Sequence, residues 1–515
     1  MRRRPIPILL ALALAVGLAP AAAQALPESA VVHEAATEDE LVGAAAAVNA
    51  DDTGAPQAIR LTGDIVLDGS SHDELVFTHD VTLLGGGHSI DLGSWGLVAQ
   101  NGATLTLGES DGSDALVIKR TGSEPRIRPL IRLGSWSGAG TLDMYDGVEL
   151  TGSIVNGAQM GSAVGIDHGT FNMHGGSIHG NENRSSAGMG GAVAGRSDSA
   201  TPVAVNISGG SIAENVSSDS GYSYNSPAVL VIGGTFTMSG GEIARNSAVH
   251  GETTADGKSL VAYGGGVGLL RSTGTITGGS IEGNTGSSQG GGIYAQNSTL
   301  RISGCTIDGN AASGFGGGIF LSSTPLTVQD TDITGNRTDG YGGALYAYGA
   351  SEVSLGSVTR IEGNSAGYGG GLANSSTGTV TVDADALLAG NLATEGAGND
   401  IAHYGKGALA LPAHPVPEAR RPYTVTGLDP VRSLREVDGW YADEPDNGWT
   451  TLTPATPTDA SGDGGAKGQD GKKAASKGLP KTGDAAWVGA AVAGVGAVTV
   501  LAGVSILRPK RSRQR

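Results

Sequence analysis

One short pattern, an aliphatic residue followed three positions later by asparagine, recurs along the chain and constrains its fold more than any other feature. The segments read IHGN, IAEN, IARN, IEGN, IDGN, ITGN, IEGN and LAGN. Successive asparagines lie 34, 31, 38, 26, 26, 28 and 27 residues apart. Repeats of about 20–50 residues are typical of solenoids, so we expect each period to form one coil. The asparagines are Asn181, Asn215, Asn246, Asn284, Asn310, Asn336, Asn364 and Asn391.

Two other segments repeat with the same period. Glycine runs that end in an aliphatic residue begin at 290, 316, 342 and 369, as GGGIY, GGGIF, GGALY and GGGLA. Pairs of apolar residues separated by one position recur too, which is the alternation of a half-buried strand. A period of 26 residues then holds three short strands and has no room for a helix. The pairs are Phe171/Met173, Val205/Ile207, Phe236/Met238, Leu300/Ile302, Leu326/Val328, Val353/Leu355 and Val380/Val382.

This arrangement predicts an all-β fold, a single-stranded right-handed parallel β-helix of about twelve coils with three strands per coil. Equivalent residues of successive coils should stack at about 4.8 Å per rung. We therefore expect Ile281, Ile307, Ile333 and Ile361 to form one buried ladder. The asparagines should hydrogen-bond along the stack, as amide ladders do in other parallel β stacks. The glycines should lie at corners, where positive φ is needed.

The β-helix is expected to span residues 58–405. The segment EDELVGAAAAVN at 38–49 is the one amphipathic helical stretch, so residues 26–57 are interpreted as an N-terminal cap over the first coil. Residues 406–451 are expected to form a C-terminal cap or extension. A Thr-, Pro-, Gly- and Asp-rich stretch at 452–478 indicates a disordered linker.

Both ends of the chain carry targeting signals. Three arginines, an apolar run and small residues indicate a secretory signal peptide at 1–25, cleaved after Ala23 or Ala25. Residues 485–507 carry no charge and are long enough to span a bilayer as a transmembrane helix. The basic tail at 508–515 should remain cytoplasmic.

The sequence LPKTGD stands directly before the apolar span. The motif, the span and the basic tail together resemble the LPxTG cell-wall sorting signal of Gram-positive surface proteins. The resemblance implies that sortase cuts between Thr482 and Gly483 and joins the chain to peptidoglycan. It also implies a secreted protein of the cell wall that contacts the membrane only transiently. The sortase motif at 479–483 comprises Leu479, Pro480, Lys481, Thr482 and Gly483.

The formal net charge of the chain is −18. Such a surface repels nucleic acid and anionic lipid, which argues against both as partners. Cys305 is the only cysteine, so the chain cannot form an internal disulfide. We expect this thiol to be buried.

The GG[AG][IL] and [IL]xxN units resemble the repeats of polymorphic outer-membrane adhesins and, more broadly, pectin-lyase-like β-helix proteins, over about residues 165–400. The resemblance implies display and adhesion, with glycans or host surface proteins as partners. It also raises the alternative of a wall-tethered polysaccharide lyase or glycoside hydrolase. A passive structural surface protein is the third hypothesis.

No catalytic set, cofactor site or metal site emerges from the residues. The positions after the ladder isoleucines, Glu282, Asp308, Thr334 and Glu362, predict an outward acidic strip. Such a strip could bind Ca²⁺, although solvated charges are the simpler interpretation. His168, His174 and His179 lie close in sequence, but their spacing fits no tight metal motif.

Two groups of residues are candidate ligand contacts. The first precedes the glycine runs, where aromatic rings at rung spacing could stack on sugars or pack against their own neighbours. The second lies in the segments that lengthen the 31- and 38-residue coils, because long loops on a rigid scaffold often carry function. The first group is Tyr263, Phe315, Tyr341 and Tyr368, and the second is Tyr222, Tyr224, His250 and Lys258.

Overall fold

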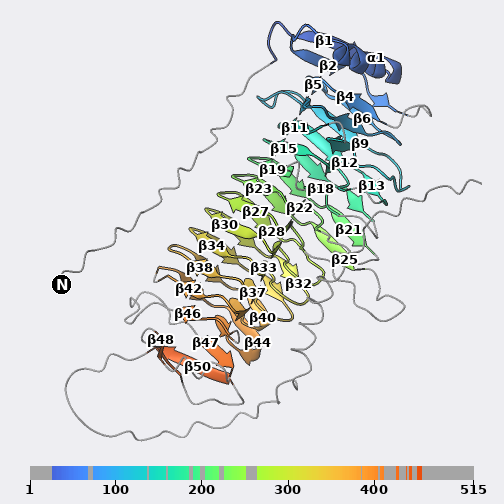
Figure 1. Ribbon diagram of the computed structural model, residues 1–515. Coiled ribbons are helices and arrows are strands. Elements are labelled where there is room, and N and C mark those ends of the chain that lie inside the picture. Colours follow the sequence, from blue (N-terminus) through green and yellow to red (C-terminus); the bar gives the residue numbers. More distant parts are fainter. Residues whose placement is uncertain are drawn as a thin grey trace, which may run out of the picture. The chain divides into compact units, whose positions relative to one another are not determined.

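The computed structural model describes most of the predicted repeat region and both of its ends. Within the part described, the chain winds through stacked parallel strands (Figure 1). Several predicted segments lie outside the described residues: the signal peptide, most of the linker, the sortase motif, the apolar span and the basic tail. The described residues are 26–67, 74–135, 138–157, 160–184, 190–197, 203–219, 226–250, 264–383, 385–403, 406–410, 425–428, 436–437, 440–442 and 449–454.

Sheet A forms the first side of each coil. Its neighbouring strands are all parallel and come from successive coils. In spatial order they are β1 (Val31–Ala35), β2 (Gln57–Leu61), β5 (Val81–Leu84), β8 (Thr104–Leu107), β11 (Gly140–Met144), β15 (Gly169–Met173), β19 (Val203–Ile207), β23 (Thr235–Met238), β27 (Thr273–Ile276), β30 (Thr299–Ser303), β34 (Leu326–Gln329), β38 (Val353–Leu355), β42 (Val380–Val382) and β46 (Leu409–Ala410).

Sheet B forms the second side and carries the predicted isoleucine ladder. Ile281, Ile307, Ile333 and Ile361 pair in register across four coils and have 0% exposure. The strands are β3 (Ile65–Val66), β6 (His88–Asp91), β9 (Leu116–Lys119), β12 (Val148–Thr151), β16 (Ser177–His179), β20 (Ser211–Ala213), β24 (Glu242–Ala244), β28 (Ser280–Glu282), β31 (Thr306–Asp308), β35 (Asp332–Thr334), β39 (Arg360–Glu362) and β43 (Leu387–Ala389).

Sheet C closes each coil and continues beyond the last one. Its coil strands are β4 (Leu75–Phe77), β7 (Leu97–Ala99), β10 (Ile131–Leu133), β14 (Val164–Ile166), β18 (Val193–Arg196), β22 (Val229–Ile232), β26 (Val267–Leu270), β29 (Ile293–Gln296), β33 (Ile319–Ser322), β37 (Leu345–Gly349), β41 (Leu372–Ser376) and β45 (Ile401–His403). The predicted parallel solenoid of about twelve coils is therefore confirmed.

Many coils contain a fourth short strand between sheets B and C, which the three-strand prediction missed. Except for β13, which follows Ser153, these strands follow the repeated asparagine directly, at a point where the sequence has no apolar alternation. They form two ladders, which we call sheet D. The first contains β13 (Ile154–Val155), β17 (Glu182–Asn183), β21 (Val216–Asp219) and β25 (Ser247–His250), and the second contains β32 (Ala311–Ala312), β36 (Arg337–Thr338), β40 (Ser365–Tyr368) and β44 (Leu392–Ala397).

The first coil is covered by a helix, as expected. Helix α1 (Glu38–Asn49) starts at Thr37, whose Oγ1 accepts a hydrogen bond from the Glu40 backbone N–H at 3.3 Å. The helix buries Leu41 and Val48 against the core. However, β1 precedes the helix and pairs with β2, so sheet A begins at Val31 rather than near residue 58.

The last coils also extend past the predicted boundary at residue 405. β46 adds a strand to sheet A, and β47 (Val425–Leu428) adds a parallel strand to sheet C. The strands that follow are antiparallel, in the order β50 (Trp449–Pro454), β49 (Trp440–Ala442) and β48 (Glu436–Val437). Sheet C thus changes from parallel to antiparallel pairing at this end.

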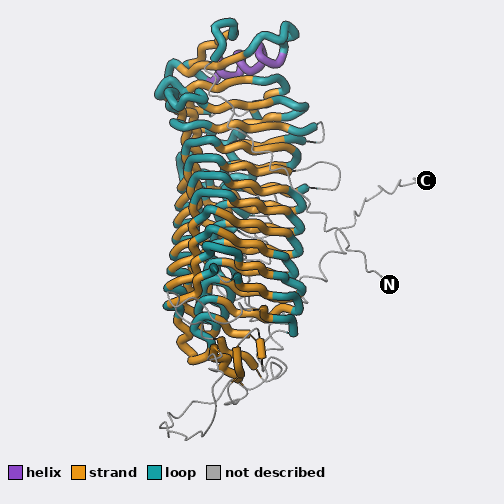
Figure 2. The backbone as a smooth tube through the Cα atoms, turned by 90° about the vertical axis from the view of Figure 1, so that its left-hand side faces the viewer, coloured by secondary structure: helices purple, strands orange, loops and turns teal. Residues whose placement is uncertain are grey.

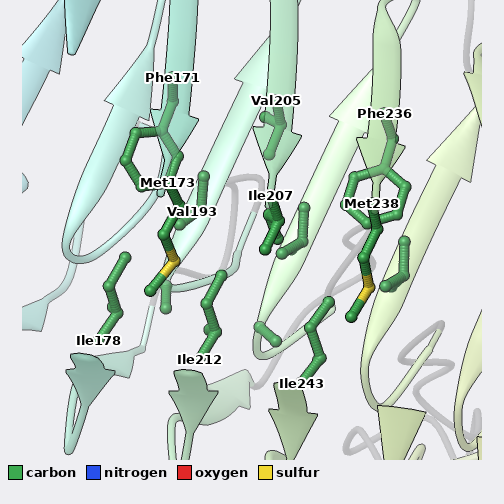
Figure 3. Close-up of a cluster of buried hydrophobic side chains, with 14 of the residues drawn as sticks. Phe171, Met173, Ile178, Val193, Val205, Ile207, Ile212, Phe236, Met238 and Ile243 are labelled. Atoms are coloured by element: carbon green, nitrogen blue, oxygen red, sulfur yellow. The ribbon is translucent and has the colours of Figure 1, made fainter. Parts of the chain in front are cut away.

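The strands of successive coils lie one above another in the backbone trace (Figure 2). The interior between the sheets is a continuous stack of apolar side chains (Figure 3). Phe171 and Met173 of β15 lie in the same rows as Phe236 and Met238 of β23, with Ile178, Ile212 and Ile243 below them in Figure 3. Each fully buried side chain of this kind contributes roughly 1.5–3 kcal/mol. Within the described residues, no helix is long and apolar enough to cross a membrane.

Candidate functional site

A buried ladder of amides links the coils where sheet B ends. Asn310 Nδ2 donates to Asn336 Oδ1 at 2.9 Å and to the Ile281 carbonyl of the preceding coil at 2.8 Å. Asn310 Oδ1 accepts from both the backbone N–H and the side-chain amide of Asn284, each at 3.0 Å. The same amide-to-amide bond joins every successive pair from Asn181 to Asn391, and Asn391 Nδ2 ends the ladder on Asp400 Oδ1 at 2.9 Å. The predicted asparagine ladder is confirmed.

A second polar ladder lies between sheets C and A, and the sequence reasoning missed it. The backbone N–H of Ser272 donates to Ser298 Oγ at 3.1 Å, and that of Ser298 donates to Thr324 Oγ1 at 3.2 Å. The Thr324 N–H donates in turn to Ser351 Oγ at 3.1 Å. These residues recur every 26 or 27 positions, so the period alone could have found them. Both ladders satisfy backbone N–H groups at the corners between sheets.

Three of the candidate aromatic residues form one stacked column, which we call the aromatic corner. Phe315 and Tyr341 stack with ring centroids 5.7 Å apart, and Tyr341 and Tyr368 stack at 5.0 Å. Their backbones form a row of β-bridges between sheets D and C. All three side chains are half-buried. The structure therefore brings these residues together as the spacing predicted.

A second aromatic column packs beside the first on the outward face of sheet C. Tyr294 and Phe320 stack at 5.2 Å, and Phe320 and Tyr346 at 5.6 Å. Phe315 contacts Tyr346 with centroids 5.0 Å apart. Tyr294, Phe320 and Tyr346 are 1–2% exposed although strand alternation points them away from the core. Their signal was present in the sequence as the last letter of GGGIY, GGGIF and GGALY.

This geometry favours mutual packing as the main role of the ring faces. Within the aromatic corner, the Tyr341 ring lies between those of Phe315 and Tyr368. A ligand at this corner would therefore meet ring edges and phenol groups more than open ring faces. Such a mixed apolar and polar edge is suited to contact with a partner surface.

The acidic strip exists on sheet B, but its carboxylates are divided among separate partners. The register aligns Glu282, Asp308, Thr334 and Glu362 in one row. Asp308 Oδ1 accepts a hydrogen bond from Thr334 Oγ1 at 2.6 Å, and Glu362 pairs with Arg360. Among the described residues, no group of three His, Cys, Asp or Glu side chains is placed to hold a metal ion.

The three clustered histidines lie along one stretch of the chain but do not form a metal site among the described residues: His168 precedes β15, His174 follows it, and His179 ends β16 on the next sheet. His179 Nε2 lies 2.8 Å from Glu149 Oε1, whereas the His174 ring stacks on Tyr145 with centroids 4.7 Å apart. Cys305 is buried, as expected, and burial together with the Glu282 charge raises the pKa of its thiol to about 12. The thiol therefore stays protonated at neutral pH.

The other candidate contacts lie largely outside the described residues. Tyr222, Tyr224, Lys258 and Tyr263 belong to segments that the structure does not describe, and so does the sortase motif from Leu479 to Gly483. His250 ends β25, but its side chain is not described. Tyr222 and Tyr224 belong to the connection between β21 of sheet D and β22 of sheet C, and Lys258 and Tyr263 to that between β25 and β26. Phe315 and Tyr341 also lie between a strand of sheet D and a strand of sheet C.

Comparison with known proteins identifies no matching family, no matching curated protein and no matching solved structure.

Proposed function

We propose that this chain is a surface protein of a Gram-positive bacterium that displays a right-handed β-helix from the cell wall and acts as an adhesin. The observation that carries the anchoring is the order of three signals at the C-terminal end. The LPKTG motif at 479–483 is followed by the uncharged segment 485–507 and the basic tail 508–515. In this proposal 485–507 is a membrane helix that holds the chain until sortase cuts after Thr482.

The fold supports this proposal because a stack of coils is stiff and presents side chains at fixed spacing. The aliphatic core and two polar ladders bind each coil to its neighbours through contacts that repeat at every rung. Function in such scaffolds usually lies on exposed edges and loops. Loss of the signal peptide (net +3) and of residues 483–515 (net +4) would change the net charge from −18 to −25, which would keep the displayed protein soluble and away from anionic surfaces.

The aromatic corner is the surface we assign to partner contact. It offers the half-buried rings of Phe315, Tyr341 and Tyr368 along one edge, backed by the buried column of Tyr294, Phe320 and Tyr346. Aromatic side chains are enriched at recognition surfaces because they combine apolar area with a polar tip and few rotatable bonds. We expect glycans or host surface proteins to bind there.

Anchoring is tested by changing Thr482→Val in the producing cell. The parent chain should be released from the wall by muramidase, whereas the variant should remain in the membrane fraction with its basic tail. Lys481→Gln is the matched control, because that position of the motif is variable, and it should be released like the parent. Equal muramidase release of the Thr482→Val variant and the parent would contradict sortase anchoring.

Adhesion is tested with the full-length chain on a panel of polysaccharides and matrix proteins, in the presence of Ca²⁺. Retention on a partner should weaken at least about fivefold in Tyr341→Ala and remain unchanged in the outward control Thr327→Ala, with no sugar product released. Released reducing or unsaturated ends that disappear in Asp308→Asn would instead establish the lyase or hydrolase alternative. Absence of both retention and product would favour the passive structural role.

A further inference from the structure

A separate aromatic feature lies on the outward face of sheet A, away from the aromatic corner. Tyr145 directly follows β11, and its backbone N–H donates to the Leu107 carbonyl of the preceding coil at 3.2 Å. Alternation along β11 buries Leu142 and Met144 completely. Asp143 and Tyr145 therefore face outward, and both are half-buried.

Another ring packs against the Tyr145 ring on one of its two faces. It stacks on His174 of the next coil with centroids 4.7 Å apart and an interplanar angle of 17°. The His174 Nδ1 atom lies 3.2 Å from Ser208 Oγ, which fixes the imidazole in turn. In the preceding coil the equivalent position is Gly108, which has no side chain. Within the described residues, Tyr145 has no second ring contact and its hydroxyl makes no hydrogen bond.

A row of polar groups runs beside this ring. Asn206 Nδ2 donates to Asn172 Oδ1 at 2.9 Å, and Asn172 Nδ2 donates to Asp143 Oδ1 at 2.7 Å. This row orients the Asp143 carboxylate and uses only one of its two oxygens. Burial, with a smaller effect of the Asp143 charge, raises the pKa of the Tyr145 phenol, so the phenol is a hydrogen-bond donor at neutral pH.

We infer that Tyr145, Asp143 and Asn172 form a binding site for one ring of a non-acidic glycan, either neutral or amine-bearing. A pyranose ring has an apolar C–H face that can pack on an aromatic ring, while its hydroxyl groups need oriented donors and acceptors. The Tyr145 ring supplies the platform, and the phenol, the free Asp143 oxygen and the amide of Asn172 supply the polar partners. The site does not depend on wall anchoring or on the aromatic corner.

Charge selects against acidic sugars at this position. Asp146 follows Tyr145 and is exposed, and a Cβ atom added to Gly112 would lie 2.9 Å from the Asp146 Cβ atom. The turn that contains Glu109 and Asp111 therefore packs beside Asp146. Uronic acids or sulfated sugars would meet several carboxylates here, whereas an ammonium group would be attracted to them.

The test measures binding of the full-length chain to three immobilised probes, cellohexaose, chitosan oligosaccharide and polygalacturonate. The first two should retain the chain and the third should not. Tyr145→Ala should weaken retention about tenfold, whereas Tyr145→Phe should keep most of it because the ring remains. Asp143→Asn should weaken binding to chitosan more than binding to cellohexaose. Thr275→Ala, an outward change elsewhere on sheet A, should have no effect.

The alternatives are separated by the same measurements. Retention of neither cellohexaose nor chitosan, or unchanged retention in Tyr145→Ala, would overturn the site. If Tyr145→Ala melts early by circular dichroism, Asp143→Ala decides, because an outward half-buried carboxylate is not needed for the core. A several-fold loss in that variant supports the site, and no loss refutes it. Tyr341→Ala should leave this binding intact, so failure here is distinct from failure of the aromatic corner.

Discussion

At the residue scale, the ladder asparagine Asn310 connects three coils through four side-chain hydrogen bonds. Asn310 receives two bonds from Asn284, donates one to the Ile281 carbonyl and donates another to Asn336. The side chain has 0% exposure, so water cannot replace these bonds. The sequence was sufficient to predict this ladder because the spacing of the asparagines is itself the signal.

Asn310→Ala should therefore lower the free energy of unfolding by on the order of 3 kcal/mol, because the Asn284 amide and the Ile281 carbonyl lose buried partners. Asn206→Ala, which removes an outward and half-buried amide, should cost less than about 1 kcal/mol. Urea unfolding of the two variants compares these values directly. Equal stabilities would show that the ladder contributes little.

The apolar ladder and the lone thiol give a second contrast between neighbouring positions. Ile307→Asp should cost several kcal/mol, because an unpaired carboxylate would stand in an apolar stack with 0% exposure. Cys305→Ser should cost much less, since a small buried thiol is replaced by a group of similar size. Thermal melting measures both, and a parent-like melting temperature for Ile307→Asp would show that the coil register is wrong.

His403, near the end of the core, makes a pH-dependent contribution to the free energy of unfolding. Its ring is 1% exposed, and its Nδ1 atom accepts a hydrogen bond from Asn374 Nδ2 at 2.8 Å. Burial lowers the pKa of His403 to about 4 from its ordinary value of 6.5. The neutral form is favoured by folding, so this contribution is fully present above pH 6.5 and is lost as the pH falls toward 4.

The expected loss is on the order of 3 kcal/mol between pH 6.5 and pH 4, at about 1.4 kcal/mol per unit of pKa difference. His403→Gln removes the titrating group, so its stability should vary less than that of the parent over this range. Chemical denaturation at pH 7, 5.5 and 4.5 gives the comparison. Parallel pH profiles for the parent and the variant would contradict a depressed His403 pKa.

At the scale of elements, a strand could be predicted from the sequence when only one of its faces is apolar and the other faces solvent. Sheet B was predictable because single isoleucines alternate with polar residues. Sheet C was harder, since both of its faces carry apolar residues, as in β33 with Ile319, Phe320 and Leu321. β1 was missed because Val31 and Val32 are exposed and give no inward alternation.

The candidate site illustrates the same limit. Phe315, Tyr341 and Tyr368 share the repeat period, so their proximity followed from the sequence. Tyr145 and His174 are different residue types in coils of different length, and only the register between β11 and β15 shows that they stack. Pairing of unlike residues across coils leaves no periodic signal in a single sequence.

The capping helix α1 makes a testable contribution at this scale. Thr37 Oγ1 accepts the Glu40 N–H, and Glu40 Oε2 accepts the Ala36 N–H at 2.9 Å, so the two side chains cap the helix reciprocally. Thr37→Ala should lower stability by about 0.5–2 kcal/mol, whereas Thr37→Ser should be close to the parent. Hydrogen exchange should then rise first in α1 and β1. Unchanged hydrogen exchange in α1 and β1 would mean that the Thr37 cap does not stabilise this end of the molecule.

At the scale of the whole molecule, additional elements extend the described stack at both ends. α1 packs on the first coil, and the antiparallel strands β50, β49 and β48 follow the last strands of sheet C. Covered ends prevent coils of separate chains from pairing edge to edge. Such end elements would suit the wall-anchored display that we propose.

The most direct test of the account is the covalent state of Thr482 in the producing cell. Muramidase-released protein is digested and its C-terminal peptide is sequenced by mass spectrometry. Sortase anchoring predicts a peptide that ends at Thr482 and carries a cell-wall fragment on its carboxyl group. Recovery of an intact chain that retains the tail at 508–515 in the membrane fraction, with no wall-linked peptide, would contradict it.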